Sequence, residues 1–102
     1  MRGKFALMAV AAGTALATLS AAPAYADEID DIFIGVLDDE GIPYTSPGEA
    51  ITVANAVCSY MADGNTLVDA TYQVMEDSGL GAADSGFFVG AAAAAYCPDF
   101  AP

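Results

Sequence analysis

Histidine and tryptophan are absent from this chain of 102 residues, and its only basic residues are Arg2 and Lys4. Without histidine, neither a Ser-His nor a Cys-His nucleophile can form. Beyond position 4 there is also no lysine for a Schiff base or for clamping a phosphate. Paired carboxylates could still cleave a glycosidic bond, but a sugar cleft normally needs size and aromatic platforms. We therefore expect a protein that is not an enzyme.

Positive charge is confined to the first four residues, whereas all 14 acidic residues lie from Asp27 onward. A region without lysine or arginine cannot neutralise phosphates, so DNA and RNA are excluded as its partners. Anionic lipid surfaces would repel it as well. Solubility is the ordinary purpose of such charge. If the partner is a protein, we expect it to present a basic surface.

The first 26 residues have the pattern of a secretory signal peptide. Arg2 and Lys4 precede an almost unbroken apolar run over residues 5–19, and Ala24-Tyr25-Ala26 forms an A-x-A cleavage site. The alternative is an uncleaved anchor helix, which the shortness of the apolar run disfavours. We predict cleavage after Ala26, secretion to the extracellular space or the cell envelope, and no membrane span in the remaining chain.

Cys58 and Cys97 are the two cysteines of the chain, and both follow the predicted cleavage site. Outside the cytoplasm, an even number of cysteines in a short domain indicates a disulfide, and two cysteines allow one pairing. A metal pair and a reactive thiol are the alternatives, but no histidine is available to complete a zinc site or to activate a thiol. A bridge that closes a loop of about 40 residues stabilises the fold by about 4 kcal/mol in the chain-entropy model.

Residues 27–102 are predicted to form a single acidic helical domain, near the size at which a hydrophobic core alone is marginal. Apolar residues recur with helical spacing, and no alternation typical of strands competes with them. The fold class is therefore all-α, a small bundle or orthogonal array of four short helices tied by the disulfide. The four helices are expected at about 27–40, 46–62, 66–78 and 83–97.

Local signals support these boundaries. Ser46 and Glu49 have the spacing of a capping box, with Pro47 at the first helical position. Glycines end the first and third predicted helices, and the tail after Cys97 is expected to fray. The third helix should turn Tyr72 inward beside its apolar stripe. The first helix should bury one stripe, formed by Ile29, Ile32, Phe33, Val36 and Leu37.

Three consecutive carboxylates, Asp38, Asp39 and Glu40, lie at the end of the predicted first helix. The helix dipole is already negative there, so each should lower stability slightly. No basic residue in the rest of the chain offsets them. They are either a solvated face or a contact for a cation or a basic partner. We take them as the candidate contact site.

Two further groups suggest ligands. Asp63, Asn65 and Asp69 resemble the start of an EF-hand, but its spacing would put Val74 where the bidentate glutamate belongs. Helix capping explains these three residues better, so no metal site is assigned. A pocket for an apolar ligand could be lined by Tyr44, Tyr60, Tyr72, Tyr96, Met61 and Met75. Core packing is the alternative for these residues, and without histidine we predict no haem or other cofactor.

Short motifs spread over residues 33–98 carry a resemblance to a known family. They are Phe33-Ile34 with Leu37, Gly41-Ile42-Pro43-Tyr44, Pro47, Ala50-Ile51, Val57-Cys58, Phe88-Val89 and Tyr96-Cys97-Pro98. In these motifs the chain resembles a family of small secreted mycobacterial proteins known as domain of unknown function 732. The Gly-Ile-Pro-Tyr turn and the two cysteine contexts are its most specific parts. The resemblance implies export, a helical fold and the disulfide, but no activity and no functional residue.

Three functions remain open. A secreted, non-enzymatic interaction or cell-envelope protein is favoured. A carrier of a small apolar ligand comes second, and an acidic module that binds calcium comes third.

Overall fold

The computed structural model describes residues 27–102, so the predicted signal peptide and its cleavage site lie outside the described residues. Over this range the chain forms α-helices and one 3-10 turn, with no strand, as the predicted all-α class requires. Its first helix covers residues 27–40. The others are α2 (Pro47–Ala62), α3 (Leu67–Ser78) and α4 (Ala82–Tyr96), followed by the 3-10 turn η1 (Pro98–Phe100).

Side chains cap the starts of α2 and α3. The Ser46 hydroxyl accepts a hydrogen bond from the Glu49 backbone N–H at 3.2 Å. The predicted capping box has two bonds, and only this one forms. The Glu49 side chain does not reach back to Ser46 and instead borders a groove between α2 and α3. α3 has a complete box, in which Thr66 and Asp69 each accept a bond from the other's backbone N–H. These bonds satisfy amides that a helix start leaves without partners.

Glycine ends the first helix and α3, as predicted. Gly41 has a φ of 74° and Gly79 a φ of 80°, the left-handed conformation that costs other residues energy. The tail differs from the prediction. It forms η1, and Ala101 packs against the core. The disulfide at Cys97 fixes the start of this segment, so η1 stays beside α4 instead of fraying.

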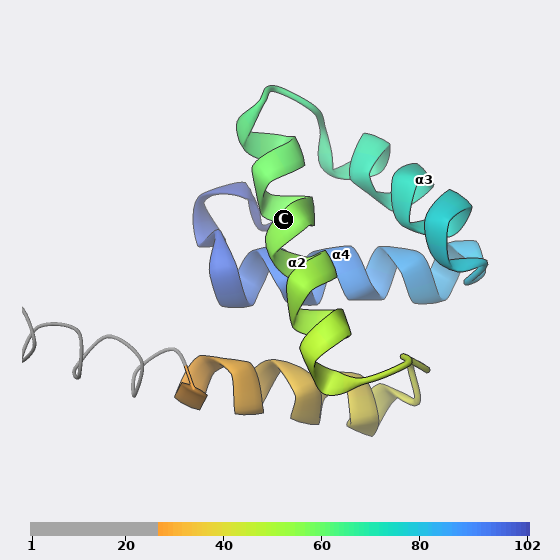
Figure 1. Ribbon diagram of the computed structural model, residues 1–102. Helices are drawn as coiled ribbons and strands as arrows, with labels where there is room; N and C mark the ends of the chain where they lie inside the picture. Colours follow the sequence, from red (N-terminus) through yellow and green to blue (C-terminus); the bar gives the residue numbers. More distant parts are fainter. Residues whose placement is uncertain (1–26) are drawn as a thin grey trace, which may run out of the picture.

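α4 lies at the centre of the array, and Figure 1 shows α2 crossing it while α3 lies beside another part of its length. α4 is apolar on most sides, as expected for a helix covered by several neighbours. Its buried residues are Ser85, Phe88, Val89, Ala92 and Ala93. Neither α4 nor any other helix of residues 27–102 is long and apolar enough to cross a membrane.

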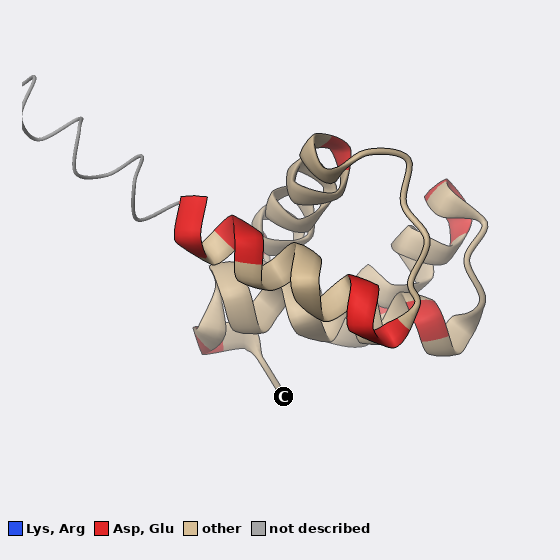
Figure 2. Ribbon diagram, turned by 90° about the horizontal axis from the view of Figure 1, so that it is seen from below, with Lys and Arg blue, Asp and Glu red and all other residues tan. Residues whose placement is uncertain are grey.

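The first helix is acidic at both ends and apolar between them (Figure 2). Its predicted stripe of five is narrower in the structure. Phe33 and Leu37 are buried, whereas Ile32 is 61% exposed and Val36 is 36% exposed. This helix packs on the array along one side only. Phe33 and Leu37, four residues apart, therefore reach the core, whereas Ile32 and Val36 border the alanine run of α4.

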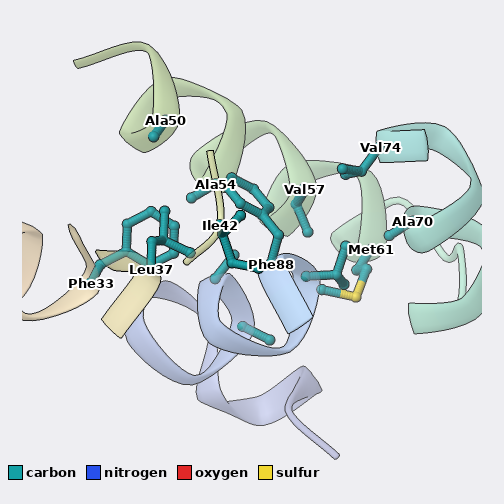
Figure 3. Packing of buried hydrophobic residues seen from close by; sticks show 13 residues of the cluster. Phe33, Leu37, Ile42, Ala50, Ala54, Val57, Met61, Ala70, Val74 and Phe88 are labelled. Carbon is teal, nitrogen blue, oxygen red and sulfur yellow. The ribbon is translucent and has the colours of Figure 1, made fainter. Parts of the chain in front are cut away.

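The hydrophobic core joins all four helices (Figure 3). Phe33 is its best-buried aromatic residue, and its ring meets those of Phe88 and Tyr96 edge-on at 5.5 Å between centroids. Tyr72 lies outside the core with 65% of its surface exposed, so its predicted inward position is wrong. Two residues turn a helix by about 200°, so Tyr72 points away from the buried Ala70 and Val74.

The predicted disulfide is present. Cys58 in the C-terminal half of α2 is bonded to Cys97 directly after α4, with a sulfur–sulfur distance of 2.06 Å. Because α2 crosses α4, this bond fixes the crossing of the two helices and the return of the chain into η1.

Candidate binding groove

An open groove with a volume of about 760 Å³ lies between α2 and α3. The two helices diverge from their connecting turn, so the start of α2 and the end of α3 stand farthest apart (Figure 1). Phe88 of α4 contributes to the lining beneath, and the loop residues 43–45 border the groove. The orientation of α2 and α3 on α4 therefore creates the groove.

Apolar side chains form both walls. They recur every three or four residues, which aligns them along one side of each helix. Val57 and Val74 are buried at the base, whereas Val53 is 37% exposed. The wall residues are Val53, Ala56, Val57 and Tyr60 from α2, and Ala70 and Val74 from α3. The groove therefore exposes apolar surface that is continuous with the core.

Carboxylates border the wide end of the groove. Glu49 comes from the first turn of α2, and Asp77 from the last turn of α3. Both are exposed, and the Gln73 amide donates to the two oxygens of Asp77 at 3.3 Å each. Because residues 27–102 contain no lysine, arginine or histidine, these charges have no internal counter-ion.

Of the three predicted contact residues, the structure links Asp38 to the groove. The Tyr44 hydroxyl donates a hydrogen bond to the Asp38 carboxylate at 2.8 Å, and Tyr44 itself borders the groove. This bond raises the pKa of Tyr44, with smaller contributions from burial and from the negative charge of Asp38. Asp39 and Glu40 are exposed at the end of the first helix, and nothing in residues 27–102 connects their side chains to the groove.

This bond was not predicted, because the partner of Asp38 is a tyrosine hydroxyl and not a basic side chain. The available signal was the turn after Gly41, which reverses the chain and returns Tyr44 towards the helix end.

The predicted aromatic pocket is present only in part. Tyr44 and Tyr60 line the groove, but Tyr72 points to solvent and Met61 is buried in the core. Tyr96 packs on Phe33 at the other end of the array, where it belongs to a structural contact. These residues do not share one pocket, because Met61 faces the core, Tyr72 lies on the solvent side of α3 and Tyr96 lies beside the first helix.

Tyr96 donates a hydrogen bond from its hydroxyl to the Asp30 carboxylate of the first helix. Its pKa is raised well above the usual value, chiefly by burial and further by the bond to Asp30 and by that negative charge. The bond therefore persists through the neutral and weakly alkaline range.

The suggested calcium ligands lie at helix ends. Asp63 follows α2, where its backbone N–H caps the helix. The Asn65 amide donates to the Tyr60 carbonyl at 2.9 Å, and Asp69 completes the capping box of α3. Within residues 27–102, no three histidine, cysteine, aspartate or glutamate side chains are grouped so that they could hold a metal ion.

Comparison with known proteins identifies relatives but no activity. A family described as "Protein of unknown function (DUF732)" matches residues 27–99. The chain is 33% identical over 91 residues to the uncharacterized protein Rv1271c of Mycobacterium tuberculosis, which covers 89% of this chain and 80% of that protein. It is 35% identical over 91 residues to the uncharacterized protein Mb1323c of Mycobacterium bovis, covering 88% and 82%. No solved structure matches it significantly.

Proposed function

Because the chain belongs to the DUF732 family, whose description names no activity, we propose its function from the groove itself: a secreted, non-enzymatic protein that acts by binding at the α2–α3 groove. The observation that carries this proposal is the apolar surface that the groove leaves open to water. Exposed apolar surface with polar residues at its border is typical of interaction sites.

The chemistry at the groove supports binding rather than catalysis. Two of its hydroxyls are bonded to the backbone, since Thr52 donates to the Gly48 carbonyl at 3.0 Å and Ser78 to the Val74 carbonyl at 2.6 Å. No histidine or lysine exists in residues 27–102 to activate a hydroxyl or to act as a nucleophile. The remaining ionisable groups there are carboxylates and tyrosines, which suit charge and hydrogen-bond contacts.

Secretion is part of the proposal, and it depends on the sequence of residues 1–26. If that segment is a cleaved signal peptide, the protein in the culture filtrate of a mycobacterial host begins at Asp27. N-terminal sequencing measures this directly. A full-length chain recovered from the membrane fraction contradicts secretion while leaving the groove untouched.

A groove-filling substitution tests the binding site. Ala56 is an exposed residue of α2 that lines the groove, whereas Ala62 is an exposed alanine of the same helix outside it. The uncharged dye Nile red should fluoresce more strongly when the secreted protein is added. Ala56→Trp should reduce this binding severalfold, and Ala62→Trp should leave it unchanged. Equal binding by both variants contradicts the proposed site.

The volume of the groove also favours a second candidate, a carrier of a small apolar ligand. Its 760 Å³ lies within the range of roughly 300–1,000 Å³ typical of small-molecule sites. Native mass spectrometry of the secreted protein distinguishes the two functions. A small apolar molecule retained in the groove supports the carrier, and the mass of the polypeptide alone supports the interaction role.

A further inference from the structure

Resting on this proposed function, we propose that the occupant of the groove is a cationic amphipathic helix of a partner protein. Three properties of the groove support this choice: the spacing of its apolar walls, the carboxylates at its border and its openness to solvent.

The apolar wall residues have a spacing that a helix can match. Val53, Ala56 and Tyr60 of α2 lie three and four positions apart, and Ala70 and Val74 of α3 lie four apart. Each wall therefore spans about one to two turns, and α3 with its 12 residues is about 18 Å long. A helix placed between two such rows can insert its own ridge of side chains into their grooves. Binding of an amphipathic helix in an apolar groove is a recurrent mode of peptide recognition.

The border of the groove selects the charge of that helix. Glu49 and Asp77 stand on opposite walls, and Asp38 adjoins through Tyr44. No positive side chain of residues 27–102 neutralises them, so lysine and arginine at the edges of the incoming helix would be attracted. A second copy of this chain is a poor occupant, because it would bring the same excess of carboxylates and no cations.

The openness of the groove favours a helix over a small molecule. Small-ligand sites bury about 70–90% of the ligand surface. This groove is open to solvent, so a wholly apolar ligand would keep one side in water. An amphipathic helix places its polar face on that side and buries only its apolar face.

Synthetic peptides provide the probe. The first is a helical peptide of about 14 residues, roughly 21 Å long, with leucine and alanine on one face and lysine on the other. The second has the same composition in a scrambled order without an apolar face, and the third replaces each lysine with glutamate. Fluorescence anisotropy of labelled peptides then measures affinity for the secreted protein at low and moderate salt.

Matched charge variants separate the groove from general attraction. Glu49→Gln with Asp77→Asn removes the carboxylates of the two walls. The control is Asp84→Asn with Glu76→Gln, which removes one carboxylate from a first helical turn and one from the last turn of α3, both outside the groove. The two double variants therefore change net charge and helix-end charge equally. Circular dichroism checks that both remain folded.

The proposal predicts that the basic amphipathic peptide binds and that the scrambled peptide binds at least about tenfold more weakly. The groove variant should lose about fivefold in affinity, as expected for two border charge pairs, whereas the control should stay within about twofold. Added salt should weaken the complex. The acidic peptide should not bind.

Four results overturn the proposal. Equal losses in the two double variants indicate general charge attraction. Peptides that never bind, while Nile red still binds and Ala56→Trp still blocks it, make the groove a small-ligand site: the binding function survives and this inference fails. A dimer that Ala56→Trp abolishes identifies a second copy as the occupant. If neither dye nor peptide binds, the proposed function fails together with the inference.

Discussion

Tyr96 joins the first helix to α4 through both its ring and its hydroxyl. The ring lies edge-on to Phe33, and the hydroxyl donates to the Asp30 carboxylate. The first helix makes few other polar contacts with the array, so this residue fixes its position. Burial and the neighbouring carboxylate keep the hydroxyl protonated by raising its pKa.

Tyr96→Phe should lower the free energy of unfolding by about 1 kcal/mol, less than the roughly 1.5–3 kcal/mol of a hydrogen bond to a charged group, since the bond is only partly shielded from water. Tyr72→Phe is the control, because Tyr72 is exposed, and it should change stability by only a few tenths of a kcal/mol. Urea denaturation measures both. Equal effects of the two substitutions contradict the assigned contact.

The same residue predicts an alkaline limit to stability. The pKa of Tyr96 is higher in the folded state than in the unfolded state. Its contribution to the free energy of unfolding is therefore complete below the unfolded-state pKa near 10, and it is lost as pH rises towards the folded-state pKa. Residues 27–102 contain no lysine and no free thiol, so tyrosines dominate this titration. The melting temperature should fall above about pH 10, and Tyr96→Phe should weaken that fall. A constant melting temperature from pH 9 to 11 contradicts this.

At the scale of elements, α4 and the disulfide hold the array together. α4 contacts α2, α3 and η1, and its Phe88 packs against Phe33 of the first helix. The bond between Cys58 and Cys97 closes a loop that contains α3 and α4 entirely. Unfolding with the bond intact therefore releases less chain entropy.

Replacing both cysteines by alanine should lower the free energy of unfolding by about 4 kcal/mol, the chain-entropy value for this loop. That loss is comparable with the whole stability that a core of this size supplies. Calorimetry should show a much lower melting temperature for the double variant. Reductant should lower the melting temperature of the unsubstituted protein and leave that of the double variant unchanged; an equal response of the two rules out the structural role of the bond.

The elements themselves could be predicted from sequence because local signals determine them. Ser46, Thr66 and Gly79 mark helix ends by backbone chemistry that needs no distant partner. The exposure of Ile32 and Val36 could not be predicted in this way, since both belong to a regular apolar stripe. Their exposure depends on how much of the first helix α4 can cover, which is a property of the packed array.

The groove was missed for the same reason. Ala50, Ala54, Val57 and Met61 recur at helical spacing along one face of α2, and these residues are buried. Val53 and Ala56 lie beside that face, and they line a groove only because α3 diverges from α2. The angle between two helices is set by a third helix beneath them, and no local pattern encodes it.

At the scale of the whole molecule, charge of one sign dominates. Residues 27–102 carry 14 acidic side chains and no basic one, and three of them follow one another at the end of the first helix. Asp38 has the Tyr44 hydroxyl as a partner. Asp39 and Glu40 remain exposed beside the negative end of the helix dipole, where they oppose folding.

Asp39→Asn with Glu40→Gln should therefore stabilise the fold, by a few tenths of a kcal/mol for each residue. The gain should shrink when about 0.5 M salt screens the charges. Asp84→Asn is the opposite control, since Asp84 lies in the first turn of α4 where negative charge is favourable, and it should destabilise. Thermal melts at two salt concentrations measure all three proteins. A loss of stability in the double variant would show that these carboxylates have a partner after all.

Site-specific photocrosslinking in a mycobacterial host tests the central claim, that this protein binds a partner protein at the α2–α3 groove. A small diazirine-bearing amino acid placed at position 56 faces the groove, and the same group at position 62 lies on α2 outside it. After irradiation of the culture, the account predicts a discrete protein adduct from position 56 that position 62 does not give and that Glu49→Gln with Asp77→Asn diminishes. Equal adducts from both positions, or no adduct from position 56, would contradict it.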